Sequence, residues 1–495
     1  MNRELLLSLD AGSGGAKCFL VDNEGKIIAS SSEEWQRDNW NTEVGWSAFR
    51  AALRYLLDKN RVNPRDIVGI TTTSMREEFV MLDDEGKEIR YTIDPDIYAH
   101  GNNLNNKHGS KIYRISGRWP VPGWIAAAKL AWLRDKKPDI FKKIKTFLMI
   151  SDWLAYALGT DPYTEASSAC ETGLFDVSTI KWSLEIIEDL NLPIDIFQEV
   201  KENSVLAGVV SSSTASETGL KTGTPIFVGG ADTQCGLLGV GAIEERHVTA
   251  VCGTTTPVQM ITNKPVFDLK KRTWTNDHIL KSKWIVESNA GKTGWVYRWF
   301  RDQMMTEERS KFTYENMNLL AETTTPGSNG LRAYLGPRIF NSGPPYWSGD
   351  RLSDVKIPSA IIGSATFSKG DLARAIIEAN CYAIRANLEQ LVEITGIKPE
   401  ALRVCGGSSK SLLWMHIQSD VLNLPLILPR EKDATAVGAA TLAATGAGLY
   451  TSMGDAIKAM IKYDPLIEPN QDRACVYEQL YRDWRDTRRR LSRTF

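Results

Sequence analysis

The sequence has few of the residues that bind metals or form disulfides. It contains seven cysteines and five histidines in 495 residues, with no Cys-x-x-Cys pair and no His-Glu-x-x-His motif. The first absence excludes a zinc ribbon and a thioredoxin-type redox site, and the second argues against a histidine-based metal site. An odd number of scattered cysteines is typical of a reducing compartment, so we expect a cytoplasmic protein.

An excess of charge of one sign and long apolar runs are also missing. Lysine and arginine number 59, aspartate and glutamate 60, and the formal net charge is -1. This balance argues against a general nucleic-acid binder and gives no attraction to an anionic membrane. The first apolar run, Leu5–Leu9, stops at Asp10, so we expect no secretory signal. Residues 434–450 are rich in Ala, Gly and Thr, which predicts a close-packed buried helix rather than a membrane span.

The order of strand and helix patterns predicts an α/β protein with two domains. Three short apolar runs within residues 5–30, separated by Gly-rich turns, are typical of an antiparallel meander. The strand–turn–strand pattern returns at residues 248–261, ahead of further helices and strands. This repetition predicts two domains of similar topology. We place their boundary near residue 245, which gives domains at 1–245 and 246–495.

The turns of the two repeats have the composition of phosphate-binding loops. Gly12-Ser13-Gly14 and Gly253-Thr254-Thr255 combine small residues, which let backbone N–H groups approach anionic oxygens, with hydroxyl donors. A dinucleotide fingerprint is excluded at the first turn because a strand, not a helix, follows it. Either turn alone is more often an ordinary hairpin, but a pair in two separate domains favours phosphate binding.

Three charged residues complete this predicted site. Asp10 ends the first strand and can face Mg²⁺ on the phosphates, since magnesium needs only one or two carboxylates. Lys17 adds a cation in the same hairpin. Asp232 follows the buried strand at 225–230, and a carboxylate there points into the ligand crevice of an α/β sheet. The alternative is that Asp232 only caps the helix that follows.

The chain resembles the FGGY family of carbohydrate kinases, within the actin/hexokinase/Hsp70-like ATPase superfamily. The resemblance lies in motifs that keep the family's order over nearly the whole chain: Asp10–Gly14, Lys129–Leu133, Gly229–Gln234, Gly253–Thr255, Leu372–Glu378, Gly406–Trp414 and Asp433–Ala440. It implies two ribonuclease-H-like (actin-like ATPase) domains around a central cleft. The implied reaction is phosphoryl transfer from ATP, with Mg²⁺, to a hydroxyl of a sugar or polyol.

The resemblance also implies roles for individual residues. Asp232 would be the catalytic base and, with Asp10, would face the metal. The residues implied to bind ATP are Gly12, Ser13, Gly14, Lys17, Gly253, Thr254, Thr255, Gly406, Gly407 and Ser411. Those implied to bind the acceptor substrate are Ser74, Met75, Arg76, Glu77, Asp232 and Gln234.

The motifs indicate the reaction more clearly than the identity of the acceptor substrate. Ser74–Glu77 and Asp232–Gly236 look most like the branch that phosphorylates the linear quorum signal autoinducer-2. In the stretch Tyr98–Asn106, the resemblance leads us to expect an Asn-x-Asp-Ala-Arg element that contacts the acceptor. Leu104 stands in place of its acidic residue and Asn106 in place of its arginine, so a pentulose or polyol kinase remains an alternative. The alternative of another class is a non-catalytic nucleotide-switch protein related to actin or Hsp70. If the protein is a kinase, its partner is a small sugar or polyol substrate. A homodimer is one possible oligomeric state.

Overall fold

The computed structural model describes residues 4–494, except 37–38, 304–312, 344–346, 349–350, 354, 356, 358 and 364. The chain packs into two compact units, neither of them continuous in sequence. Unit 1 contains Met1–Ile243, Thr275–Trp284 and Asp433–Lys462; unit 2 contains Glu244–Trp274, Ile285–Lys432 and Tyr463–Phe495. The division of the sequence at residue 245 and the central cleft stay predictions.

Unit 1 is built around a six-stranded mixed sheet with the order β11-β12-β4-β1-β2-β3. The strands β1, β2 and β3 form an antiparallel meander, while β4 and β12 run parallel to β1 on its other side. The meander predicted from the N-terminal sequence is therefore confirmed. Its strands and helices are β1 (Leu5–Gly12), β2 (Gly15–Asp22), β3 (Ile27–Glu34), α1 (Thr42–Lys59), β4 (Ile67–Ser74), β5 (Phe79–Leu82), α2 (Ile97–Leu104), α3 (Ser110–Ser116), α4 (Ala126–Lys136), α5 (Pro138–Phe141), β6 (Thr146–Met149), α6 (Ile150–Leu158), β7 (Thr164–Glu165), α7 (Ala166–Ala169), β8 (Phe175–Asp176), β9 (Lys181–Trp182), α8 (Leu184–Asp189), β10 (Val200–Lys201), β11 (Leu206–Val209), α9 (Ser212–Thr218), β12 (Pro225–Ala231), α10 (Asp232–Gly239), α15 (Ala434–Gly446) and α16 (Met453–Met460).

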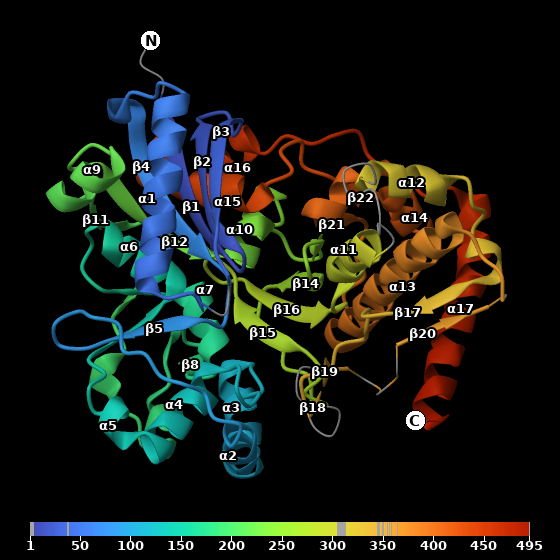
Figure 1. Cartoon of the computed structure of the whole chain (residues 1–495), viewed down its shortest axis with the longest axis horizontal. Coiled ribbons are helices and arrows are strands. Elements are labelled where there is room, and N and C mark those ends of the chain that lie inside the picture. Colours follow the sequence, from blue (N-terminus) through green and yellow to red (C-terminus); the bar gives the residue numbers. More distant parts are fainter. Residues whose placement is uncertain are drawn as a thin grey trace. The chain divides into compact units, whose positions relative to one another are not determined.

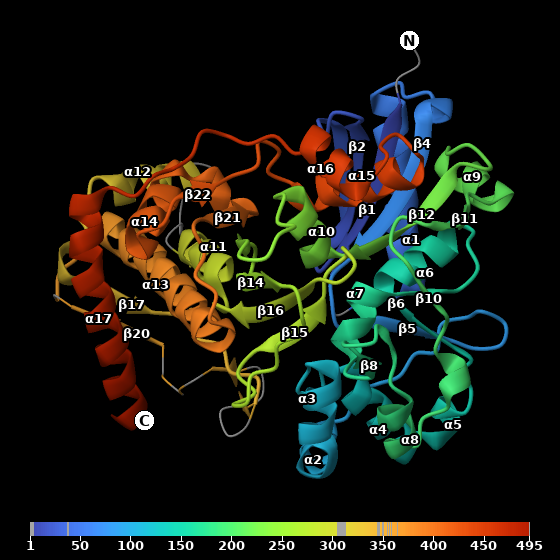
Figure 2. The same cartoon turned by 180° about the vertical axis from the view of Figure 1, so that it is seen from behind.

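Helices cover both faces of this sheet. The amphipathic helix α1 begins at the N-cap Asn41, whose side chain accepts from the Val44 N–H, and packs on one face (Figure 1). The other face is covered by α15, with α16 beside it (Figure 2). Residues 434–446 are mostly buried, which confirms the close-packed helix predicted from their composition. The structural reason is Gly438, because a Cβ there would lie 1.8 Å from the Cys235 carbonyl oxygen of α10.

Unit 2 contains the repeat of the strand–turn–strand pattern. Its strands follow the order β16-β14-β13-β21-β22, in which β13 pairs antiparallel with β14 and parallel with β21. The elements of this part of the chain are β13 (Val248–Val251), β14 (Pro257–Thr262), β15 (Trp274–Asp277), β16 (Trp284–Asn289), α11 (Thr293–Gln303), α12 (Tyr314–Glu322), β17 (Arg332–Tyr334), β18 (Trp347–Ser348), β19 (Arg351–Leu352), β20 (Ala360–Ile362), α13 (Lys369–Thr395), β21 (Leu402–Cys405), α14 (Leu412–Leu422), β22 (Leu426–Ile427) and α17 (Gln471–Thr494). Of these, β15 and β16 run across the boundary between the two units.

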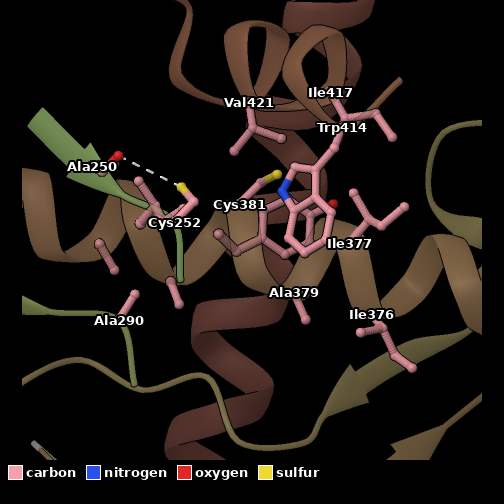
Figure 3. Close-up of a cluster of buried hydrophobic side chains, with 14 of the residues drawn as sticks. Ala250, Cys252, Ala290, Ile376, Ile377, Ala379, Cys381, Trp414, Ile417 and Val421 are labelled. Atoms are coloured by element: carbon pink, nitrogen blue, oxygen red, sulfur yellow. Dashed lines mark hydrogen bonds between the residues drawn. The ribbon is translucent and has the colours of Figure 1, made fainter. Parts of the chain in front are cut away.

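The core of unit 2 forms around the long helix α13. A capping box starts this helix: Asp371 N–H donates to the Ser368 hydroxyl, and Ser368 N–H donates back to the Asp371 carboxylate. Cys381 of α13 and Trp414 of α14 lie in one buried cluster with Cys252, whose thiol donates to the Ala250 carbonyl (Figure 3). All seven cysteines of the chain are unpaired, and six of them are buried. Within the described ranges, no helix combines the length and the apolar character that a membrane crossing requires.

Candidate active site

Three parallel strands of unit 1 end side by side and bring predicted site residues together. Asp10 of β1 lies opposite Thr73 of β4, and the next pair in the register joins Ala11 to Ser74. On the other side of β4, Ser74 lies opposite Ala231, the residue before Asp232. Asp10, Ser74 and Asp232 therefore reach the same edge of the sheet, because the carboxyl ends of parallel strands coincide there.

The first hairpin places Lys17 opposite Asp10. These two residues are cross-strand neighbours of β1 and β2, and the Lys17 Nζ lies 3.9 Å from the Asp10 Oδ2. Burial raises the pKa of Asp10 above its ordinary value, while the positive charge of Lys17 lowers it and the negative charge of Asp433 raises it. Asp433 was not among the predicted site residues, and its negative charge opposes ionisation of Asp10.

Asp232 is the first residue of α10, and the N-cap of that helix is Ala231. The interpretation of Asp232 as the N-cap residue is therefore wrong. Its carboxylate accepts the N–H of Thr233 at 2.7 Å, and its backbone carbonyl accepts the hydroxyl of Thr435 at 3.2 Å. The second contact links the start of α10 to the start of α15.

A buried carboxylate, Glu165, supports the backbone just before Asp232. It is the N-cap of α7 and accepts the N–H groups of Ser167 and Ser168 at 2.7 and 2.8 Å. The Ser167 hydroxyl donates to the same carboxylate at 2.9 Å and accepts the N–H of Ala231 at 2.9 Å. Glu165 is therefore linked through one serine to the end of β12, directly before Asp232.

The loop after β4 contains the predicted acceptor residues. Ser74 is buried and its hydroxyl donates to the Met75 carbonyl at 3.0 Å. Arg76 Nη1 lies 3.2 Å from the Glu171 Oε1, and Glu77 accepts from Arg118 at 3.3 Å. Glu77 has a φ of 73°, in the left-handed region that residues other than glycine rarely adopt.

Gln234 lies one position beyond Thr233 in α10 and is fully buried. Its Oε1 accepts the Thr233 hydroxyl at 2.7 Å, while its Nε2 has no hydrogen-bond partner among the described residues. A buried amide donor without a partner is costly, and an acceptor hydroxyl within reach would relieve that cost.

In unit 2, the second predicted phosphate turn and the predicted adenosine turn are neighbours. Cys252 N–H donates to the Cys405 carbonyl at 2.8 Å, and Ser408 N–H donates to the Cys252 carbonyl at 3.3 Å. These bonds join Cys252, the residue before the 253–255 turn, to Cys405 and Ser408 on either side of Gly406-Gly407. The start of α11 adjoins the same turn, since Trp295 N–H donates to the Thr254 carbonyl at 3.1 Å.

Ser411, the last predicted ATP-binding residue, is the N-cap of α14. Its hydroxyl accepts the Trp414 N–H at 3.3 Å, so the side chain has a structural role in addition to any contact with a nucleotide. The Ser411 N–H donates to the Ser408 carbonyl at 3.1 Å, which connects this N-cap to the 3₁₀ helix Gly407–Lys410.

The glycines of the predicted phosphate and adenosine turns fall into two groups. A Cβ on Gly14 or Gly407 would meet no atom of the described residues within 4 Å, and on Gly253 only an ordinary contact at 3.6 Å. Gly406, in contrast, has a φ of 92° and would place a Cβ 2.6 Å from the Cys252 carbonyl oxygen. The fold requires glycine at Gly406 but not at the other three positions, where the open space suits a ligand close to the backbone.

The residues of the unit 1 edge fit a magnesium ion shared with a nucleotide. Asp10 is nearly buried, and its Oδ1 has no hydrogen-bond partner in the described part of the chain. Over the same residues, no group of three or more His, Cys, Asp or Glu side chains forms a metal cage. Magnesium usually takes one or two carboxylates and completes its shell with phosphate oxygens and water, so this donor set is sufficient.

The sequence did not point to Asp433, Glu165, Ser167, Glu171 or Arg118 as site residues. None lies in a pattern that distinguishes it from a surface carboxylate, serine or arginine, except that Asp433 opens one of the recognised motifs. Their importance comes from long-range contacts, which no local spacing encodes. The predicted site residues are divided between the two units, with residues 253–255, 406–407 and 411 in unit 2 and the others in unit 1. That the two sets face one another stays a prediction.

Each unit contains parts that a phosphotransferase needs: a Gly-rich turn after a strand in both, and carboxylates at a sheet edge in unit 1. Residues 5–239 match the N-terminal domain, and residues 248–447 the C-terminal domain, of the FGGY family of carbohydrate kinases. The chain belongs to this family, which confirms the resemblance seen in its motifs. It is a carbohydrate kinase that acts on a hydroxyl group, and the family uses ATP as the phosphoryl donor.

Individual relatives agree with this family. The chain is 32% identical to an autoinducer-2 kinase of Escherichia coli over 97% of its own length and 92% of the relative's. Its structure is similar to xylulose kinase from Lactobacillus acidophilus, with a TM-score of 0.84, 21% identity and 98% coverage of each chain. It is also similar to Plasmodium falciparum glycerol kinase with ADP, with a TM-score of 0.82, 20% identity and 98% coverage of each chain. The predicted α/β kinase fold with two domains is confirmed.

Proposed function

We propose that this carbohydrate kinase phosphorylates a hydroxyl group of autoinducer-2, with Asp232 as the general base. The observation that carries the choice of acceptor is the similarity to an autoinducer-2 kinase over nearly the whole of both chains. The side chains after β4 add to it, because Arg76 and Glu77 offer a donor and an acceptor to a molecule rich in hydroxyl groups.

The proposed mechanism assigns each step to residues of this chain. Arg76 and Glu77 hold the acceptor so that one hydroxyl lies beside the Asp232 carboxylate. Asp232 takes the proton of that hydroxyl as its oxygen bonds to the γ-phosphorus and the bond from phosphorus to the ADP oxygen breaks. The N–H groups of the Gly12–Gly14 and Gly253–Thr255 turns, with Lys17, stabilise charge on the phosphates.

Asp10 would hold Mg²⁺, and Asp232 would face the same ion. When bound, the ion supplies charge neutralisation on the phosphate oxygens. Gly406, Gly407 and Ser411 would border the adenosine of ATP. We further propose that the protein acts in the cytoplasm, in line with its unpaired cysteines.

The first experiment measures ATP consumption with autoinducer-2, D-xylulose, glycerol and gluconate at equal concentrations. Autoinducer-2 is expected to give the highest kcat/KM. A higher value for D-xylulose or glycerol would replace this proposal by the pentulose or polyol kinase. That alternative is favoured by Leu104 and Asn106, which stand in the predicted acceptor element in place of charged residues.

The second experiment tests the base. Asp232→Asn keeps the size of the side chain but cannot accept a proton, so kcat should fall by about 10²–10⁴-fold while ATP still binds. Asp10→Asn is the matched control. Loss of the Asp10 carboxylate weakens Mg²⁺ binding, so excess Mg²⁺ should partly restore the kcat of Asp10→Asn but not that of Asp232→Asn. A folded Asp232→Asn enzyme with near-normal kcat would refute the role of Asp232 as base.

A further inference from the structure

Four charged side chains of unit 1 form a continuous chain that ends in the predicted acceptor loop. Arg76 Nη1 lies 3.2 Å from the Oε1 of Glu171, and Arg118 Nη1 lies 3.3 Å from the Oε1 of Glu77. Arg118 Nη2 and Glu171 Oε2 pair directly and link the two halves. The order is therefore Arg76–Glu171–Arg118–Glu77, with opposite charges at every step; we call it the charge chain.

Burial differs sharply along the charge chain. The side chains of Arg118 and Glu171 are 0% exposed, whereas those of Arg76 and Glu77 are 11% and 26% exposed. The two inner residues come from segments distant in sequence. Arg118 follows the left-handed Gly117 that ends α3, and Glu171 lies in the short 3₁₀ helix Cys170–Thr172 after α7.

Stability alone does not explain a fully buried ion pair. Removing each ion from water costs several kcal/mol, and well-packed apolar residues of similar volume are often as stable or more so. The acceptor loop also contains a cost of its own, because the left-handed φ of Glu77 is a strained conformation worth on the order of 1–3 kcal/mol. Strain of this kind persists where the surroundings hold it, and here Arg118 holds the Glu77 carboxylate.

We infer that Glu171 and Arg118 are positioning residues of the acceptor site: Glu171 orients the Arg76 guanidinium and Arg118 orients the Glu77 carboxylate toward the hydroxyl groups of an uncharged acceptor. This inference rests on the proposed function, which places the acceptor at Arg76 and Glu77. The reason for an uncharged acceptor is that the charge chain has two positive and two negative groups. Each outer group already faces an opposite charge, so the loop offers hydrogen bonds without a net field for an anion.

A purely structural role for the buried pair predicts a different pattern of effects. Glu171 and Arg118 would then join α3 to the 3₁₀ helix, and their loss would lower stability without a selective effect on the acceptor. Glu378 in unit 2 provides the matched control. It is also buried, 2% exposed, and its Oε1 accepts from the buried Arg374 Nε at 3.0 Å, far from the acceptor loop in sequence.

The test measures kcat and both KM values, with autoinducer-2 as the probe, for Glu171→Gln and Glu378→Gln. Loss of a charge-assisted hydrogen bond is typically worth about 1.5–3 kcal/mol, or about 10–150-fold. Glu171→Gln should raise the KM for autoinducer-2 by about this factor and change the KM for ATP less than about twofold. Glu378→Gln should lower the Tm and leave both KM values near those of the wild type. If Glu171→Gln does not fold, Glu171→Asp, which keeps the charge but shortens the side chain, is measured in the same way and should show the same selective rise.

A double-mutant cycle separates positioning from structure. If Glu171 acts through Arg76, then Glu171→Gln should have little further effect on the acceptor KM when Arg76→Ala is already present. Fully additive effects, or a lower Tm with an unchanged acceptor KM, would overturn the inference. Turnover of gluconate with a kcat/KM comparable to that of autoinducer-2 would overturn the uncharged-acceptor part.

Failure of the proposed function is recognised separately. It would appear in wild-type enzyme as faster turnover of D-xylulose or glycerol, before any variant is made. In that event the same cycle is run with the faster acceptor, and a selective rise in its KM still supports the positioning role. An unchanged KM in Arg76→Ala would remove both the acceptor assignment of Arg76 and the role of Glu171.

Discussion

Replacement of Gly407 by alanine should strengthen the fold and weaken ATP binding at the same time. Gly407 begins the short 3₁₀ helix 407–410, its φ is not left-handed, and a Cβ there meets no described atom within 4 Å. Alanine therefore fits the folded chain and reduces the freedom of the unfolded one, which should raise the free energy of unfolding by about 0.4–1 kcal/mol. If adenosine lies against this backbone, the added methyl group overpacks the contact by about 1–3 kcal/mol. The dissociation constant for ATP should then rise about 5- to 150-fold.

The control is Gly438→Ala, where the structure predicts the opposite pattern. A Cβ at Gly438 would lie 1.8 Å from the Cys235 carbonyl oxygen and 2.9 Å from the Gly239 nitrogen, so α10 and α15 must separate. The expected loss is about 3 kcal/mol or more, at the upper end of typical overpacking. Folded Gly438→Ala is not expected to share the specific loss of ATP affinity.

Urea unfolding and calorimetric titration with a non-hydrolysable ATP analogue measure the two quantities for both variants. Gly407→Ala with the expected gain in stability and unchanged affinity for the analogue would refute the placement of adenosine at this turn. A stability loss in Gly407→Ala comparable to that in Gly438→Ala would refute the reasoning about open space. Equal effects of both variants on affinity would point to a general disturbance of the fold.

Two further predictions concern stability. Burial lowers the pKa of His278 from 6.5 to about 4, with Nδ1 accepting the Leu280 N–H and Nε2 facing the Ala242 carbonyl. As the pH falls, the unfolded chain binds this proton before the folded one does. The free energy of unfolding should therefore fall by about 3 kcal/mol between pH 6.5 and pH 4 on account of His278. Urea unfolding of His278→Gln at several pH values should show a pH dependence that is smaller by this amount. Trp414→Ala should cost about 3–5 kcal/mol, since this side chain is 2% exposed in the cluster of Figure 3; a loss under about 1 kcal/mol by urea unfolding would contradict it.

Several elements of the fold could be predicted because their signals are local. The alternation and Gly-rich turns of residues 5–30 predicted the meander that β1, β2 and β3 form. The small residues after Ala434 predicted a buried helix, which α15 forms. Helix α15 ends at Gly446, short of the predicted 450, since helix ends depend on capping contacts.

The candidate site also has features that the sequence predicted and features that it did not. Asp10 and Asp232 were predicted because each stands at the end of an apolar run, and parallel pairing with β4 then brings both to one edge. The interpretation of Asp232 as an N-cap was wrong by one residue, since the helix takes Ala231 as its cap. Sequence spacing cannot distinguish these two positions, because a helix start is set by the backbone angles around it.

The sequence by itself determined the chemistry: strand ends with carboxylates, turns of small residues, and motifs in the order of a carbohydrate kinase family. Only the tertiary structure decided which other groups act on these residues. Glu171, Arg118 and Glu165 have no local pattern, and each becomes significant through contacts with residues 38 to 95 positions away, such as Arg76 and Asn203. The physical reason is that burial and pairing of charge depend on distances between segments, which folding sets and a single sequence does not display.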